Sequence, residues 1–308
     1  MEQEQEHKQL HKVVDFNFES SQDGAHCFAK SYYPKAKLTK KVVHVIFQHG
    51  AIEYHKRHQE FFDHLRGEFG NRLVISTMDL VGHGLSGGSR AHIDKFDYYV
   101  EDFLKFIRIF HHLYQFHEVE THLVGHSLGG MIITKTLVDK ADQIPFKISS
   151  VTLTNPCIKP LLELPKFVNE LTIKLSKKLS KMRVPSLYDG FNLTSDRSRA
   201  IAFNHDPLNS DFVTVKMGVE ILKTSKIITP YSYYIKHPMF FLLSGRDEVV
   251  DVEKTKLFMG GLNKAMTKES FYIDSKHDIL NEICRKEVFQ EISDYIKFKQ
   301  WEQQCKST

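Results

Sequence analysis

A Gly-x-Ser-x-Gly pentapeptide at residues 125–129 is the strongest indication of chemistry in the sequence. A serine hydroxyl is a poor nucleophile unless the chain holds it beside a base and near hydrogen-bond donors for an oxyanion. A sharp turn between a strand and a helix holds it in this way. Leu123 and Val124 precede the motif, and an apolar pattern with helical spacing follows it. The context therefore predicts Ser127 as a covalent nucleophile.

Two residues nearer the C-terminus complete a serine, acid and histidine set. The histidine acts as the base, and a carboxylate fixes its tautomer. Where a turn of this kind carries the serine, the chain order is serine, acid, histidine. We predict Asp247, in a tight turn after an apolar run, as the acid and His277, after the last predicted strand, as the base. Three other carboxylates compete with the first of these: Glu248, Asp251 and Asp274.

A second glycine-containing turn follows the predicted strand at 42–47. Gly50 allows the backbone to turn its amides inward, so we expect the N–H groups of Ala51 and Leu128 to form an oxyanion hole. His49 is interpreted as a structural residue that braces this loop. A further glycine-rich loop, at 79–87, lacks the spacing of a nucleotide-binding loop and is interpreted as a supporting turn.

The 18 histidines of the chain raise the question of a metal site. They cluster at 44–64 and at 111–117, but the sequence has no His-Glu-x-x-His pattern. No acidic residue is spaced to join either cluster on one helical face. We therefore predict no metal and no cofactor, and we interpret these histidines as solvated surface residues.

Composition limits the class of protein. A chain of 308 residues with 41% hydrophobic residues can form one α/β domain with an insertion, or two small domains. A net charge of +4 gives no reason to expect nucleic acid as a partner. The first residues are polar and acidic, unlike a signal peptide, and no apolar run approaches the roughly 18 residues that span a bilayer. Four cysteines without a framework spacing indicate free thiols, and hence a cytoplasmic protein: Cys27, Cys157, Cys284 and Cys305.

Strand and helix patterns alternate along most of the chain, which predicts a mostly parallel, doubly wound sheet with right-handed crossovers. The alternation stops at 156–230, where helical patterns are interrupted by prolines. We expect a core formed by 1–155 and 231–308, with 156–230 inserted over the carboxyl ends of the strands, where open α/β sheets bind ligands. The predicted strands lie at 13–18, 26–33, 42–47, 73–79, 123–124, 151–154, 239–243 and 270–273, and the predicted helices at 59–68, at 98–114 and after Ser127.

Together these residues resemble the monoacylglycerol lipase and lysophospholipase branch of the α/β-hydrolase superfamily, which is similar to serine aminopeptidases of the S33 type. The resemblance implies an α/β-hydrolase fold: a mostly parallel eight-stranded sheet with helices on both faces and a helical cap insertion. It also implies a Ser127–Asp247–His277 triad and hydrolysis of a carboxylic ester with a long acyl chain. The matching residues are His49-Gly50-Ala51 with Glu53, Asp79, Gly82-His83-Gly84 with Ser86, 125–129, Gly245 with Asp247, and His277-Asp278-Ile279 with Glu282.

The expected cap contains a basic amphipathic stretch between Leu164 and Met182. We predict that Phe167, Leu171 and Leu175 contact the acyl chain. Such a stretch can dock at an anionic lipid surface, or it can pack its apolar side on the core and leave its lysines solvated. The same triad could instead serve a small ester, a thioester or an N-terminal prolyl peptide. A non-catalytic binding protein is a further alternative, and the sequence does not indicate an oligomeric state.

Overall fold

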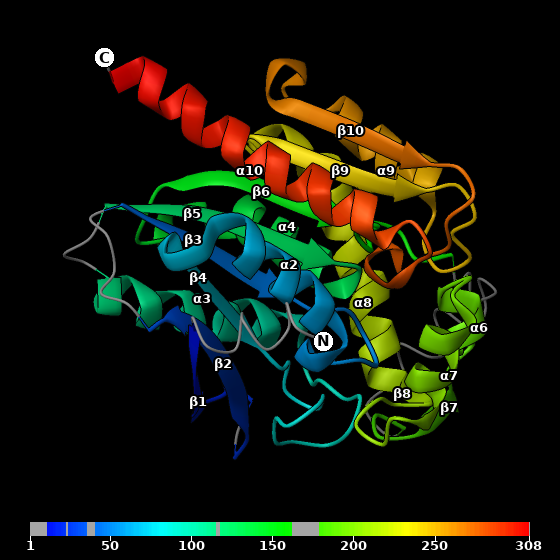
Figure 1. Cartoon of the computed structure of the whole chain (residues 1–308). Coiled ribbons are helices and arrows are strands. Elements are labelled where there is room, and N and C mark those ends of the chain that lie inside the picture. Colours follow the sequence, from blue (N-terminus) through cyan, green and yellow to red (C-terminus); the bar gives the residue numbers. More distant parts are fainter. Residues whose placement is uncertain (1–10, 23, 36–40, 115–117, 162–178, 308) are drawn as a thin grey trace.

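The computed structural model describes residues 11–22, 24–35, 41–114, 118–161 and 179–307. Eight strands form one sheet in the order β1-β2-β4-β3-β5-β6-β9-β10 (Figure 1). The strands β4, β3, β5, β6, β9 and β10 of this sheet are parallel to one another, whereas β2 runs antiparallel to both of its neighbours. The strands are β1 (His11–Glu19), β2 (His26–Pro34), β3 (Lys41–Gln48), β4 (Leu73–Met78), β5 (Glu118–His126), β6 (Ile148–Thr154), β9 (Met239–Ser244) and β10 (Thr267–Tyr272). The predicted mostly parallel sheet is confirmed.

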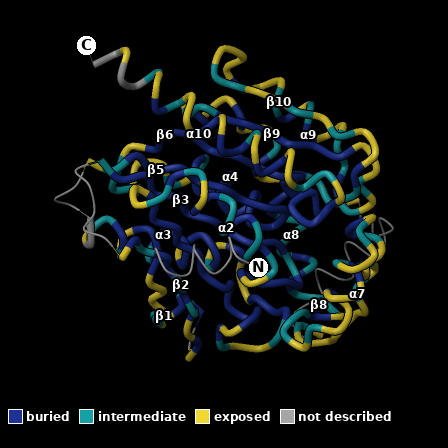
Figure 2. Tube along the Cα trace, viewed as in Figure 1, coloured by how far each residue is buried: buried dark blue, intermediate teal, exposed yellow. Residues whose placement is uncertain are grey.

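Apolar side chains on both faces of the central strands explain why the sheet lies between two layers of helices. In β3, Val42 and Ile46 belong to one hydrophobic core, and Val43, Val45 and Phe47 belong to the other. Successive side chains of a strand point to opposite faces, so a continuous apolar run fits a strand buried on both sides. Figure 2 shows this central burial. The helices α3 (Phe96–Tyr114), α4 (Leu128–Asp139) and α9 (Val252–Gly260) cover one face, and α2 (Gln59–Phe69) and α10 (Arg285–Ser307) cover the other.

Residues 155–238, here called the β6–β9 connection, leave the sheet between two neighbouring strands. Its described part adds no strand to the main sheet, and residues 183–214 lie beyond the carboxyl ends of the parallel strands (Figure 1). Its last helix returns to pack against α3 and α4. The connection contains β7 (Arg183–Pro185), α6 (Gly190–Leu193), α7 (Arg197–His205), β8 (Phe212–Thr214), α8 (Val215–Ile228) and the 3-10 helix η4 (Thr229–Tyr234).

The predicted strands and helices of the sheet region are present, with shifted ends. The last strand begins at Thr267 rather than at 270, because Lys268 and Glu269 lie on an edge strand where charged side chains reach solvent. The strands β7 and β8 were not predicted, since three residues are too few to show an alternating pattern. No helix of the described residues is long and apolar enough to cross a membrane.

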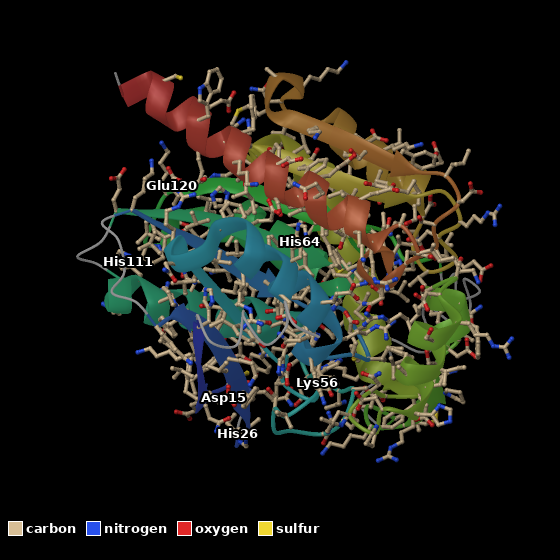
Figure 3. The ribbon with its side chains drawn as sticks, in the orientation of Figure 1. Asp15, His26, Lys56, His64, His111 and Glu120 are labelled. Atoms are coloured by element: carbon tan, nitrogen blue, oxygen red, sulfur yellow. The ribbon has the colours of Figure 1, made fainter. Side chains whose placement is uncertain are left out.

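The interpretation of the histidines at 44–64 as surface residues is wrong. His44 lies in β3 and bonds through Nε2 to the Ser76 hydroxyl at 2.9 Å. Burial lowers the pKa of His44 to about 3, so the ring is neutral. His64, labelled in Figure 3, is half-buried on α2 and packs against Phe289 of α10. The buried histidines of this cluster are His44, His49, His55 and His58.

Candidate active site

Ser127 occupies a sharp turn between β5 and α4. Its backbone has φ +50° and ψ −115°, and the left-handed sign of φ is unfavourable for a serine. Hydrogen bonds to residues 154 and 157 fix the backbone N–H and the carbonyl of Ser127. Ser127 N donates to the Thr154 carbonyl at 3.1 Å, and Cys157 N donates to the Ser127 carbonyl at 2.9 Å. The sharp turn predicted from the pentapeptide is present, and these two hydrogen bonds hold its strained backbone in place.

The two glycines of the pentapeptide are required by close backbone approach. A Cβ at position 129 would lie 2.2 Å from the Gln48 carbonyl oxygen. A Cβ at position 125 would lie 2.8 Å from Ile133 Cδ1 and 2.9 Å from the backbone of Gly130. Any larger residue would push α4 away from β3 and β5, so the glycines allow the turn to stay tight.

The structure brings Ser127, Asp247 and His277 together although they lie far apart in the sequence. His277 Nδ1 is 2.7 Å from Asp247 Oδ2, and His277 Nε2 is 2.8 Å from Ser127 Oγ. With Nδ1 protonated, the ring donates to the carboxylate and accepts the serine hydroxyl, which is the arrangement that a serine nucleophile needs. The other Asp247 oxygen accepts from Val249 N at 2.8 Å and Val250 N at 2.9 Å, which fixes the carboxylate.

The three competing carboxylates are engaged elsewhere. A carboxylate that fixes the histidine tautomer must contact Nδ1 of the ring, and Asp247 occupies that position. The others have different partners: Asp251 caps α9 through Lys254 N, Asp274 pairs with Arg246, and Glu248 accepts from Asn192 Nδ2. The geometry therefore favours Asp247 as the acid.

Charged groups around His277 raise its basicity. Burial of the ring lowers its pKa, but the Asp247 carboxylate, together with smaller contributions from Asp278 and Glu53, outweighs burial, and the pKa rises above its ordinary value. The ring of His126 lies 5.1 Å away, and burial lowers the pKa of that histidine to about 4, so it adds no positive charge near neutral pH.

The raised pKa predicts the pH dependence of hydrolysis. A general base must be neutral, so kcat/KM should rise with pH to a plateau, with a midpoint above the ordinary histidine value of 6.5. The measurement is kcat/KM for a short ester from about pH 5 to about pH 9. The labelling rate of a fluorophosphonate should follow the same curve, since it needs the same base. A midpoint at or below 6.5 for both reactions would contradict the proposed environment of His277.

The predicted oxyanion donors lie on either side of the nucleophile. Ala51 and Leu128 both border the cavity that contains Ser127. A Cβ at Gly50 would lie 3.2 Å from Ser127 Cβ, so this loop passes directly against the nucleophile. Leu128 is the first residue of α4, where backbone N–H groups lack partners within the helix. The placement fits an oxyanion hole, and the role of the two N–H groups stays a prediction.

A buried cluster of charged residues beside the site was not assigned a role from the sequence. Arg57 Nε lies 2.7 Å from Asp278 Oδ2 and 3.4 Å from Glu53 Oε2. His58 Nε2 lies 3.1 Å from Glu53 Oε1, which also accepts from Gly50 N at 2.7 Å. Burial would raise the pKa of Glu53, but its neighbours, His58 first and Arg57 as well, outweigh burial and hold the pKa well below its ordinary value. Glu53 and Arg57 are four residues apart, but Glu53 lies outside any helix, so the helical spacing rule would not have indicated this pairing.

The β6–β9 connection is attached to the loop that carries His277. Asp278 N donates to the Leu193 carbonyl at 2.8 Å, and Ser195 N donates to Glu282 Oε1 at 2.8 Å. In the same loop, the Asn281 carbonyl accepts a hydrogen bond from Thr194 Oγ1 at 2.9 Å. Residues 193–195 and 278–282 thus form one hydrogen-bonded unit.

An apolar cavity of about 370 Å³ lies between the sheet and the β6–β9 connection and contains Ser127 and His277. Its volume is within the range of small-molecule sites. The predicted acyl contacts Phe167, Leu171 and Leu175 lie outside the described residues. The connection supplies other apolar lining residues: Leu187, Leu193, Phe203, Val213, Ile221 and Leu222.

Known proteins resemble this chain over most of its length. Residues 39–283 match the family described as serine aminopeptidase, S33. The phospholipase YtpA of Bacillus subtilis is 27% identical over 262 residues, which cover 82% of this chain and 95% of that protein. The monoglyceride lipase of Homo sapiens is 25% identical over 282 residues, which cover 89% of this chain and 88% of that protein. A solved structure of a soluble variant of the monoglyceride lipase of Saccharomyces cerevisiae, with a substrate analogue, has a TM-score of 0.78 at 19% identity and covers 94% of this chain and 96% of that one.

The matched region begins just before β3 and ends after the loop that carries His277. It therefore includes the turn at Ser127, the turn at Asp247 and the glycine turn at Gly50, which are the segments that suggested the resemblance. The chain belongs to the serine aminopeptidase S33 family, within the α/β-hydrolase superfamily.

Proposed function

We propose that the chain hydrolyses carboxylic esters with long acyl chains, such as monoacylglycerols or lysophospholipids. His277 takes the proton of Ser127 while the serine attacks the ester carbonyl. The N–H groups of Ala51 and Leu128 stabilise the oxyanion, and the alcohol leaves with a proton from His277. A water molecule, activated by the same histidine, then releases the fatty acid from the acyl-enzyme.

The observation that carries the proposal is an apolar cavity that leads to the serine hydroxyl. Each methylene moved from water into an apolar site contributes about 0.8 kcal/mol. A long acyl chain can thus supply binding energy that a short acyl chain cannot. Relatives named as a phospholipase and as monoglyceride lipases add support. In this proposal residues 156–230 act as the cap over the site.

The family description also raises an aminopeptidase as an alternative. Such an enzyme needs a carboxylate that is available to bind the charged amino group of its substrate. Among the described residues that line the cavity, Glu53 and Asp278 carry such groups. Arg57 contacts both of them, and His58 contacts Glu53 as well. Because these carboxylates are already paired, we expect the site to favour an uncharged ester over a peptide with a free, charged amino terminus.

The dependence of rate on acyl length tests the proposal. kcat/KM for p-nitrophenyl esters should rise from acetate to decanoate, and Leu222→Asp should lower the decanoate to acetate ratio at least tenfold. A charge in the channel forfeits the transfer energy of several methylenes, at about 0.8 kcal/mol each, and about 1.4 kcal/mol is a factor of ten. The matched control is Leu257→Asp, because Leu257 is 68% exposed on α9, and its ratio should equal that of the wild type.

A flat profile from acetate to decanoate would contradict the long-chain proposal and leave a small-ester hydrolase. Faster cleavage of a proline p-nitroanilide than of every ester would favour the peptidase. Neither result would affect the roles proposed for Ser127, Asp247 and His277. The cytoplasmic location and lipid docking by the cap stay predictions.

A further inference from the structure

Asn155 lies where the segments that carry Ser127, Asp247 and His277 meet. It follows β6 directly, and its side chain is fully buried. Its φ of +41° is in the left-handed region, which asparagine tolerates better than most residues with a side chain. A residue in this conformation persists only where its surroundings fix it. The contacts of Asn155 therefore indicate which segments fix the turn after β6.

The side-chain amide of Asn155 connects the base to the strand that leads to the acid. Nδ2 donates to the carbonyl oxygen of His277 at 2.7 Å and to Ser244 Oγ at 2.7 Å. Oδ1 accepts from Ser244 N at 2.9 Å. Ser244 ends β9, shortly before the turn that contains Asp247. Both amide hydrogens are thus used, and one of them holds the peptide group of the base itself.

The backbone on either side of Asn155 holds the nucleophile. The carbonyl of Thr154, the preceding residue, accepts from Ser127 N, and Cys157 N donates to the Ser127 carbonyl. Asn155 N donates to the carbonyl of Leu242 in β9 at 3.0 Å. A shift of the 154–157 turn would consequently move the serine and the histidine relative to each other.

We infer that Asn155 is a positioning residue for the Ser127, Asp247 and His277 set, acting through its hydrogen bonds to the His277 carbonyl and to Ser244. The inference rests on the proposed function, because it takes those three residues as the catalytic set. Asn155 is not among the described residues that line the cavity. Its loss should therefore reduce kcat and leave KM for a short ester nearly unchanged.

Two substitutions test this role. Asn155→Gly keeps the left-handed backbone without strain and removes the amide. Asn155→Asp keeps the shape but places an acceptor against the His277 carbonyl. For both, kcat per active site should fall by the order of 10²-fold, since a misplacement of about 1 Å costs this much. Active sites are counted by fluorophosphonate titration, and KM for p-nitrophenyl acetate should stay within about twofold of the wild type.

The pH profile of Asn155→Gly separates positioning from loss of stability. The charged or titratable groups that face His277 are Asp247, Asp278, Glu53 and His126, and this variant leaves all of them in place. A looser contact between His277 and Asp247 would lower the pKa of the histidine, so the acid limb of kcat/KM should move to lower pH. A purely structural role would leave this limb unchanged.

A buried serine far from the site provides the control. In β2, Ser31 is fully buried and donates from Oγ to the Ile75 carbonyl at 3.0 Å. Ser31→Ala should lower Tm while kcat per active site stays at the wild-type value. If both Asn155 variants behave like Ser31→Ala, the inference is overturned. If Ser127→Ala still reacts with the fluorophosphonate, the proposed function fails, whatever the Asn155 variants do.

Discussion

Ser127→Ala should lower kcat for ester hydrolysis by the order of 10⁶-fold while the protein stays folded. The hydroxyl is the atom that attacks, so its removal leaves only substrate binding and the oxyanion donors to accelerate the reaction. The Ser127 Oγ contact is with His277 Nε2, and alanine can occupy the same turn, so Tm should change little. A fluorophosphonate probe should label the wild-type protein and leave the variant unlabelled. The measurements are in-gel labelling and steady-state hydrolysis.

Ser150 is a suitable control because it is a fully buried serine on the neighbouring strand β6. Its hydroxyl bonds to His122 Nδ1 at 2.8 Å, away from the cavity. Ser150→Ala should be labelled at the wild-type rate. Labelling of Ser127→Ala at that rate would mean that the nucleophile lies elsewhere.

Asp247→Asn should lower kcat by roughly 10⁴-fold. The amide oxygen can still accept from the N–H groups of Val249 and Val250, so the turn should fold. The amide nitrogen would then face His277 Nδ1 and favour the tautomer with its proton on Nε2, which cannot accept the proton of Ser127. The carboxylate is also the main group that raises the pKa of His277, so the residual activity should have its acid limb at lower pH.

The competing carboxylates are the controls for this substitution. Asp251→Asn and Asp274→Asn should each stay within a few-fold of the wild-type rate, because Asp251 caps α9 and Asp274 is exposed beside Arg246. If either variant loses more activity than Asp247→Asn, the assignment of the acid is wrong. KM for a short ester should be similar in all three variants.

The sequence was most informative where chemistry restricts the residue type. Ser127, Asp247 and His277 could be chosen because each follows a predicted strand, and parallel strands end at the same edge of a sheet. Asn155 could not be chosen in this way. Its partners are a backbone carbonyl and a serine at distant positions, and neither leaves a pattern along the chain. The Asn-Pro pair at 155–156 indicates only a turn.

The burial of the histidines at 44–64 could not be predicted from the sequence for a related reason. Whether a histidine is exposed depends on the partner that the fold provides, and partners can lie far along the chain. His44 is buried because Ser76 of the adjacent strand meets its ring, and His49 is buried because it accepts from Leu80 N. The bracing role expected for His49 agrees with this bond, whereas the surface location expected for its neighbours does not.

The hydrogen bonds between residues 193–195 and 278–282 restrict how the connection over the site can be exchanged. In a chimaera that takes its cap from another hydrolase, the donor segment would have to supply a carbonyl for Asp278 N and an N–H for Glu282. A graft that stops short of 193–195 would keep the recipient's histidine loop intact and change only the acyl-binding walls. Substrate range is therefore easiest to change by chimaera construction when the crossover points keep residues 193–195 together with the recipient's sheet and histidine loop.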